Sequence, residues 1–341
     1  MDEKILQELS EVIQSSNINF LLGAGASTPF LPLLGNIEQT LNNTKDYNVK
    51  ETQYKKYFNE VMLPNKKIIS NVLISDDNFQ KTKSAYKNFF QVLSEIVLRR
   101  KSTILSKQVN LFTTNIDILM ETVLEDLHIE YNDGFSGKFI PIFNLANFKK
   151  SIHQRSLHFE HITEIPVFNV IKIHGSLTWK NSESGEKIIF SHALDHLDEN
   201  LSNKKGEEFT NGYRKILVVN PEEAKHLESV LNVYYSELLR LYSSELEKEN
   251  TSLFIIGFSM EDKHIKEITL RAAKSNPTLR IFICCSQSCK VAMCTKMELL
   301  QHPNIQIYTP ENDSDKFTLV YLTENLLKKI TLKKKSEKNA E

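Results

Sequence analysis

Residues 18–27 read Ile18-Asn19-Phe20-Leu21-Leu22-Gly23-Ala24-Gly25-Ala26-Ser27. The first half of this segment is apolar and predicts a short buried strand, and the glycines after it predict a tight turn. Apolar residues recur on one helical face at residues 4–13, so an amphipathic helix is expected just before the strand. Glycines in a strand-to-helix turn let a diphosphate approach backbone N–H groups. A tight turn without a ligand is the alternative, because the third glycine and the later acidic residue of the dinucleotide fingerprint are missing.

Further strands are expected along the chain, and helices separate most of them. The strand segments are residues 109–113, 167–173, 216–219, 253–256, 280–284 and 305–308. The helices are expected at residues 117–127, 222–247 and 262–273. Residues 42–107 show helical periodicity and no strand pattern. Strands that alternate with helices predict an α/β fold, with a doubly wound, mainly parallel, Rossmann-like sheet and a helical insertion.

The composition is that of an ordinary folded protein. The 341 residues are 40% hydrophobic, and 42 Lys and Arg balance 43 Asp and Glu. These values exclude a disordered chain and give no overall attraction to nucleic acid or membrane. The N-terminus lacks a signal-peptide pattern, and no apolar run approaches the roughly 18 residues of a membrane span. The four cysteines lie within residues 284–294 at a spacing unlike that of zinc knuckles, and we interpret them as buried, inert thiols of a reduced, cytoplasmic protein.

Three of the later strand ends carry residues that could take part in chemistry. They are Thr114, Asn115 and Asp117 after residues 109–113, His174 after residues 167–173, and Gly257 and Ser259 after residues 253–256. Ligands bind at the carboxyl ends of the strands in an open α/β sheet. An amide such as that of Asn115 can position a water or a sugar hydroxyl, and a histidine can act as a general base. Structural roles are the alternatives: helix capping for the polar residues and a turn for His174.

Taken in order, these segments resemble the motifs of the sirtuin-like superfamily over roughly residues 15–275. The motifs are Gly23-Ala24-Gly25-Ala26-Ser27, Thr114-Asn115-Ile116-Asp117, His174-Gly175 and Gly257-Phe258-Ser259. The resemblance implies a sirtuin-type fold that binds NAD and cleaves its nicotinamide–ribose bond. By position, Gly23, Ala24, Gly25 and Ser27 would line the diphosphate and nicotinamide pocket. Asn115 would sit at the ribose, Asp117 at the carboxamide, and Thr114 beside them in the cofactor-binding segment. His174 would be the base, and Gly257 and Ser259 would approach phosphate or adenosine ribose.

Several departures separate this chain from sirtuin deacylases. The four-cysteine zinc module after the catalytic histidine is absent, and Thr114 replaces the usual glutamine. Residues 251–265 look more like bacterial antiviral sirtuin-like effectors, which hydrolyse NAD to nicotinamide and ADP-ribose. The resemblance therefore implies an NAD hydrolase without zinc, with Asn115 and His174 as catalytic residues, that acts in anti-phage defence by NAD depletion. A non-catalytic NAD or ADP-ribose sensor is the alternative, and a protein deacylase or ADP-ribosyltransferase is a further one.

The expected organisation is a sirtuin-like NAD-binding domain at residues 1–310, with the helical insertion at about 42–107, and a C-terminal helix and basic tail at 311–341. The tail has six lysines between residues 328 and 338. It is too short for a sensor domain, so control is expected from assembly or from another chain. We expect a homo-oligomer whose favoured partner resembles a HerA-type ring ATPase, with a short Argonaute as the alternative. The tail lysines are expected to stay solvated rather than to bind nucleic acid directly.

Overall fold

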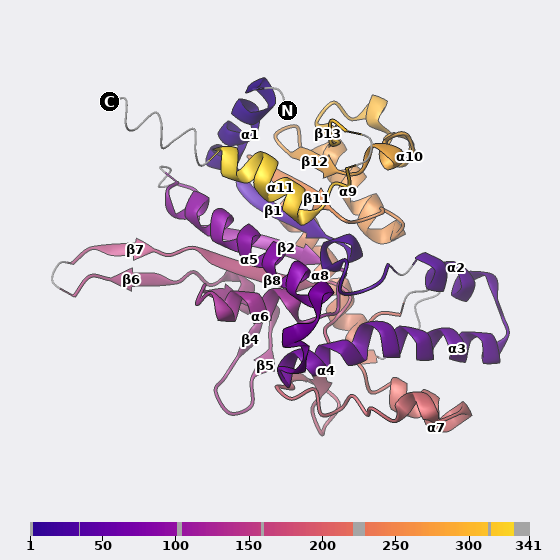
Figure 1. The fold of residues 1–341 in the computed structure, drawn as a ribbon. Helices are drawn as coiled ribbons and strands as arrows, with labels where there is room; N and C mark the ends of the chain where they lie inside the picture. The colour runs from indigo at the N-terminus through magenta and orange to yellow at the C-terminus, as the bar shows by residue number, and fades with distance from the viewer. Residues whose placement is uncertain are drawn as a thin grey trace.

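Seven strands form a parallel sheet at the centre of the computed structural model, which describes residues 3–33, 35–100, 104–157, 160–220, 229–312 and 315–330. Across the sheet the strands follow the order β13-β12-β11-β1-β2-β8-β3. All of them except the short β3 are labelled in Figure 1. Their bounds are β1 (Asn17–Leu22), β2 (Gln108–Thr113), β3 (Tyr131–Asn132), β8 (Val167–Lys172), β11 (Thr251–Ile256), β12 (Arg280–Cys284) and β13 (Ile305–Tyr308). The chain builds one side of the sheet from β1 to β8 and then crosses β1 to build the other side. The predicted doubly wound α/β fold is therefore confirmed.

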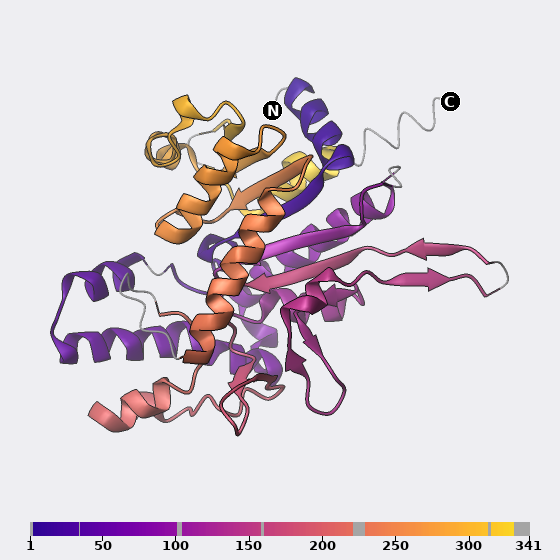
Figure 2. The same ribbon diagram turned by 180° about the vertical axis from the view of Figure 1, so that it is seen from behind.

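The two faces of the sheet belong to two separate hydrophobic cores, because successive residues of a strand point to opposite faces. Phe20 of β1 packs with α1 (Glu3–Ser15), α5 (Asp77–Leu98), α6 (Leu119–Asp126) and α11 (Leu319–Leu322). Leu21 packs on the other face with α8 (Ser229–Leu246), α9 (Lys263–Ser275) and α10 (Lys290–Lys296). Figure 1 looks onto the face that α5 and α11 cover, and Figure 2 onto the face that α8 crosses.

Helices fill the segment between β1 and β2. They are α2 (Gly35–Asn43), α3 (Tyr47–Tyr57), the π-helical turn η2 (Phe58–Met62), α4 (Leu63–Ile69), η3 (Val72–Ser75) and α5. No strand occurs in residues 35–100, as the sequence predicts. The last of these helices, α5, belongs to the hydrophobic core that contains Phe20 of β1. Phe89 of α5 lies edge-on to Phe20, with ring centroids 5.3 Å apart. Among the described helices, none is long and apolar enough to cross a membrane.

Smaller elements surround this frame. A second, antiparallel sheet consists of β4 (Phe135–Ser136), β5 (Ile142–Phe143), β10 (Ile188–Phe190) and β9 (Trp179–Asn181). The hairpin of β6 (His153–Arg155) and β7 (Ile162–Glu164) extends away from the main sheet (Figures 1 and 2). The other elements are α7 (Gly206–Tyr213), the π-helical turn η8 (Thr323–Leu327) and the 3-10 turns η1 (Ala24–Ser27), η4 (Leu145–Lys149), η5 (Leu201–Asn203), η6 (Gln287–Cys289) and η7 (Leu299–Gln301).

The predicted strand at residues 216–219 is wrong. This segment is buried, which explains its strand-like sequence, but it makes one isolated antiparallel bridge, between Val218 and Gly175. A Cβ added to Gly175 would lie 2.3 Å from the Leu217 carbonyl oxygen, so the two backbones are too close for a side chain there. The first part of the helix predicted at 222–247 and the basic tail beyond residue 330 lie outside the described residues.

Candidate functional site

Four predicted motifs lie side by side at one edge of the sheet. They follow β1, β2, β8 and β11, which are neighbours in the sheet and run parallel. Leu22, the last residue of β1, is in register with Thr113 of β2 and with Ile256 of β11. The carboxyl ends of these strands therefore meet where the winding direction reverses, which is the usual ligand position in doubly wound sheets.

A cavity of about 780 Å³ opens at this edge. Eight of the ten predicted site residues line it: Ala24, Ser27, Thr114, Asn115, Asp117, His174, Gly257 and Ser259. Residues of α2 and α3, among them Glu38 and Tyr57, contribute to its lining. The helices between β1 and β2 thus provide one wall of the cavity, and the strand ends provide another.

Gly23 and Gly25 are not among the lining residues; they pack against the turn after β11. A Cβ on Gly23 would lie 2.4 Å from the Gly257 carbonyl oxygen, and one on Gly25 would lie 2.7 Å from the Gly257 Cα. The N–H of Gly25 donates to the Gly257 carbonyl oxygen at 2.9 Å, and that of Gly23 donates to the Ile256 carbonyl oxygen at 3.0 Å. The predicted approach of a diphosphate to these N–H groups is therefore not available in this structure.

The turn after β1 also differs from the expected strand-to-helix turn. It continues into η1, a single 3-10 turn, and the next α-helix begins at Gly35. A turn of this length has no extended helix dipole to attract phosphate. Close backbone packing between the turns after β1 and β11, which needs glycines at the contact, explains this sequence motif.

Asn115 is 8% exposed, and its amide orientation follows from its partners. Its Nδ2 donates to the Gly23 carbonyl oxygen and to Ser27 Oγ, both at 3.0 Å. A carbonyl oxygen can only accept, so the nitrogen of the amide must face Gly23. Both amide protons are then used by the protein, which leaves Oδ1 as the group that can accept a hydrogen bond from a ligand.

Asp117 lines the cavity and also accepts a local backbone hydrogen bond just before α6, although the N-cap position of that helix is Ile118. Its Oδ2 accepts a hydrogen bond from Ser27 Oγ at 2.8 Å, and its Oδ1 accepts one from the N–H of Leu119 at 3.1 Å, where α6 begins. The hydroxyl of Tyr86 lies 3.4 Å from Ser27 Oγ. Burial raises the pKa of Tyr86, so this hydroxyl is neutral at physiological pH. Ser27 thereby links Asn115 and Asp117 in one buried network.

His174 is paired with an acid that was not predicted as a site residue. Its Nε2 lies 3.0 Å from Oδ2 of Asp262. The other carboxylate oxygen of Asp262 accepts hydrogen bonds from the N–H groups of His264 and Ile265, which caps α9 and fixes the side chain. A carboxylate in this position orients an imidazole and stabilises its protonated form. The sequence marks Asp262 as a helix start, but no local pattern reveals a contact 88 residues away.

The cysteines lie apart from this cavity and are free. Cys284 and Cys285 are buried, as predicted, whereas Cys289 is exposed and Cys294 is half-buried, so the expectation of four buried thiols is wrong. Burial raises the pKa of Cys285 to about 11. Within the described ranges, no group of three or more His, Cys, Asp or Glu side chains could hold a metal ion.

Comparison with known proteins shows one matching family and a related solved structure. The model of the SIR2-like domain family matches residues 109–308, which include Asn115, His174 and Gly257 but not the first motif. Among solved structures, a Sir2 mutant with a p53 peptide and NAD aligns with 14% sequence identity and a TM-score of 0.47, covering 96% of this chain and 99% of that chain. No curated protein matches the sequence.

Proposed function

Since this chain belongs to the SIR2-like domain family, we propose that it binds NAD at the carboxyl edge of its sheet and hydrolyses the nicotinamide–ribose bond. One observation supports this function most directly. The Asn115 amide and the His174–Asp262 pair line the same cavity, although they come from three different strand ends. A group that positions a water and a base that takes its proton are the two parts that hydrolysis needs.

The cavity suits a dinucleotide in size, and both acidic and basic side chains line it. Its volume of about 780 Å³ lies within the roughly 300–1,000 Å³ of typical ligand sites. Asp117 and Glu38 bring acidic groups to it, which favours the positively charged nicotinamide ring. Lys263 and His264 also line it and offer basic side chains for the diphosphate.

The proposed reaction breaks the bond between ribose C1′ and the nicotinamide nitrogen. Nicotinamide leaves with the bonding electron pair, and its nitrogen already carries the positive charge in NAD, so no general acid is required. A water oxygen then forms the new bond to C1′ and loses one proton. Asn115 Oδ1 accepts a hydrogen bond from the water or from a ribose hydroxyl, and His174 accepts the proton while Asp262 stabilises the imidazolium. The products are nicotinamide, ADP-ribose and a proton that the histidine later releases.

The biological part of the proposal rests on the sequence resemblance. We propose that the chain acts in anti-phage defence by NAD depletion, as a homo-oligomer whose activity depends on a partner. A HerA-type ring ATPase is the favoured partner, and a short Argonaute is the alternative. Light scattering, together with NAD assays at several protein concentrations, tests this part. A monomer with full, concentration-independent activity would contradict it.

The test of the activity is NAD turnover by the purified full chain, alone and with the proteins encoded beside it. We expect chromatography to show equal amounts of nicotinamide and ADP-ribose. His174→Ala should lower turnover by at least about 10²-fold, whereas His153→Ala, which changes an exposed histidine of the β6–β7 hairpin, should not. Tight NAD binding by calorimetry without nicotinamide release would favour the sensor, and NAD-dependent removal of an acyl group from a peptide would favour the deacylase.

A further inference from the structure

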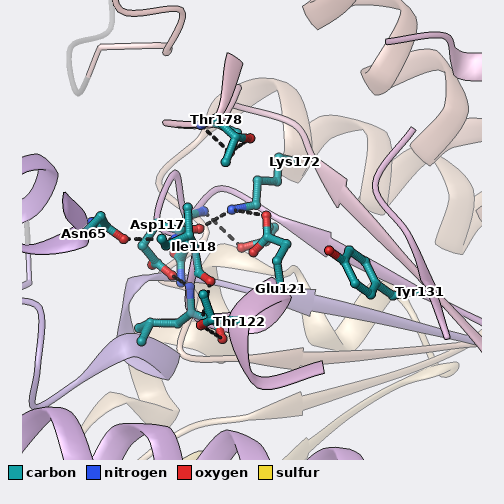
Figure 3. Close-up of polar contacts among 12 residues, drawn as sticks. Asn65, Asp117, Ile118, Glu121, Thr122, Tyr131, Lys172 and Thr178 are labelled. Atoms are coloured by element: carbon teal, nitrogen blue, oxygen red, sulfur yellow. Dashed lines mark hydrogen bonds and ion pairs between the residues drawn. The ribbon is translucent and has the colours of Figure 1, made fainter. Parts of the chain in front are cut away.

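A buried lysine connects the two segments that carry the proposed catalytic residues. Lys172, the last residue of β8, is 4% exposed and stands two positions before His174. Its ammonium group donates a hydrogen bond to the main-chain carbonyl oxygen of Asp117 (Figure 3). It also lies 2.8 Å from Oε1 of Glu121, on the first turn of α6. The strand that leads to the base is thus tied to the loop that carries Asn115 and Asp117.

Glu121 balances the charge of this lysine. Glu121 is 8% exposed as a residue, and its Oε2 is buried without a hydrogen-bond partner in the described part of the chain. Burial raises the pKa of Glu121, and the neighbouring Lys172 opposes that shift. A buried pair of this kind is weak evidence for stability, because desolvation offsets the attraction between the charges. Its position beside the site therefore suggests a role other than stability.

The loop is held in place from several sides. The Asn65 side-chain oxygen, from α4, accepts a hydrogen bond from the N–H of Ile118 at 2.9 Å. The N–H of Leu177 donates to the Ile116 carbonyl oxygen at 3.1 Å. Lys172 adds a charged donor at the carbonyl of Asp117. Asp117 in turn accepts from Ser27, which accepts from Asn115, so a shift of this carbonyl would be passed on to the catalytic amide.

Lys172 does not line the large cavity. It lines a separate cavity of about 10 Å³, together with Glu121, Asp133 and Thr178. That volume is about enough for one water molecule, so no nucleotide can reach the ammonium group there. Any effect of Lys172 on the reaction must act through the residues that it holds.

We propose that Lys172 is a positioning residue, which holds the Asp117 backbone so that Asn115 and His174 keep their relative placement for the chemical step. This role rests on the proposed NAD hydrolysis. Glu121 serves as the counter-charge that makes a buried ammonium tolerable. Lys172→Met should lower kcat by about 10²-fold, the cost of a displacement of roughly 1 Å, with little change in KM.

Two variants separate positioning from stability. Arg100→Met is the matched control: Arg100 is also buried and donates to main-chain carbonyls, those of Ile13 and Ser16 near the amino end of β1, far from the site edge. It should lower Tm but leave kcat unchanged. The double variant Lys172→Met/Glu121→Gln removes both charges, so it should regain stability relative to Lys172→Met. Its kcat should stay low, because the donor to the Asp117 carbonyl is still missing.

Hydrogen–deuterium exchange of residues 114–119 provides a readout that does not need NAD turnover. The amides of Asn115, Ile118 and Leu119 donate within this network. They should exchange faster in Lys172→Met and in the double variant, but not in Arg100→Met. Recovery of kcat in the double variant, an equal loss of kcat in Arg100→Met, or unchanged exchange would each overturn the proposal. If the wild-type chain does not hydrolyse NAD, the proposed function fails, while the exchange experiment still decides whether Lys172 holds the loop.

Discussion

The Nε2 atom of His174 lies 3.0 Å from Oδ2 of Asp262, so a side-chain contact joins the turn after β8 to the start of α9 at the carboxyl edge of the sheet. The two residues stand on opposite sides of β1 in the strand order. Both strand ends therefore have to be in place before the histidine has its carboxylate partner. The pair spans the point where the winding of the sheet reverses.

Asp262→Asn tests the charge of this partner. The amide oxygen can still cap α9, but it stabilises a protonated imidazole less than a carboxylate does. We expect kcat for NAD hydrolysis to fall by about 10- to 100-fold, with a nearly unchanged Tm. Asp262→Ala is the companion variant, since it also removes the cap and should cost about 1 kcal/mol of stability. Wild-type kcat in Asp262→Asn would exclude a catalytic contribution of this carboxylate.

Asn115→Ala and Asn115→Asp test the orientation of the amide. Alanine removes the amide oxygen that is left to accept from a ligand and the donor to Gly23 and Ser27, so kcat should fall by at least about 10²-fold. Aspartate keeps an accepting oxygen in place of Oδ1 but puts a second oxygen against the Gly23 carbonyl oxygen, which repels it. Both variants should therefore be impaired in steady-state nicotinamide release. An active Asn115→Asp enzyme would show that the contact with Gly23 does not position the side chain.

Gly25→Ala tests the close packing between the turns after β1 and β11. The new methyl group would lie 2.7 Å from the Gly257 Cα, a backbone atom that cannot rotate away. Overpacking of this kind costs roughly 1–3 kcal/mol. Gly35→Ala is the control, because a Cβ at Gly35 meets no atom within 4 Å. Urea denaturation should show a large loss for the first variant and a change within about 0.5 kcal/mol for the second; equal losses would contradict the packing role.

The buried pair of Lys172 and Glu121 predicts a pH-dependent stability. A carboxyl whose pKa is raised on folding favours the folded state at low pH, and this contribution is lost as the pH rises from the unfolded value of 4.5 through the raised folded value. Glu121 interacts with Lys172, Asp117 and Tyr131, and it lines the small cavity together with the buried Asp133, whose own pKa is raised by burial. Lys172 alone among these groups lowers the pKa of Glu121.

Lys172→Met should therefore raise the pKa of Glu121 further. The stability that this variant loses relative to wild type should be larger at about pH 8 than at about pH 5. Urea denaturation at both pH values measures this difference. The double variant Lys172→Met/Glu121→Gln lacks the titrating carboxyl, so the extra pH dependence should disappear. A deficit that is the same at both pH values would mean that Glu121 does not titrate in this range.

Chelation tests the expectation that zinc is neither bound nor required. The cysteine spacing does not fit zinc knuckles, and the described side chains form no metal-binding group. We expect EDTA to change neither Tm nor NAD turnover, and lysine deacylation to be negligible. Stoichiometric zinc by elemental analysis, or efficient deacetylation of a peptide in the presence of NAD, would contradict this expectation.

The sheet and the gathering of the motifs were predictable from local sequence. Apolar strands alternate with amphipathic helices, and the carboxyl ends of parallel strands must share one edge. Residues 216–219 show the limit of this reasoning. Their apolar run correctly indicates burial, but a strand also needs a neighbour that offers a row of backbone partners. In the described part of the chain, this segment forms one bridge, between Val218 and Gly175. The strands of the smaller sheet have two or three residues each, too few to show a period.

The sequence alone determined which residues lie at the edge of the sheet, because each strand and the turn that ends it are formed by residues that are neighbours in the chain. The tertiary structure decided what those residues do there. The pairing of His174 with Asp262, the contact of Gly25 with Gly257 and the tie of Lys172 to Asp117 all join segments that are distant in the chain. Such contacts depend on how helices and turns pack across several strands, and no local periodicity carries that information.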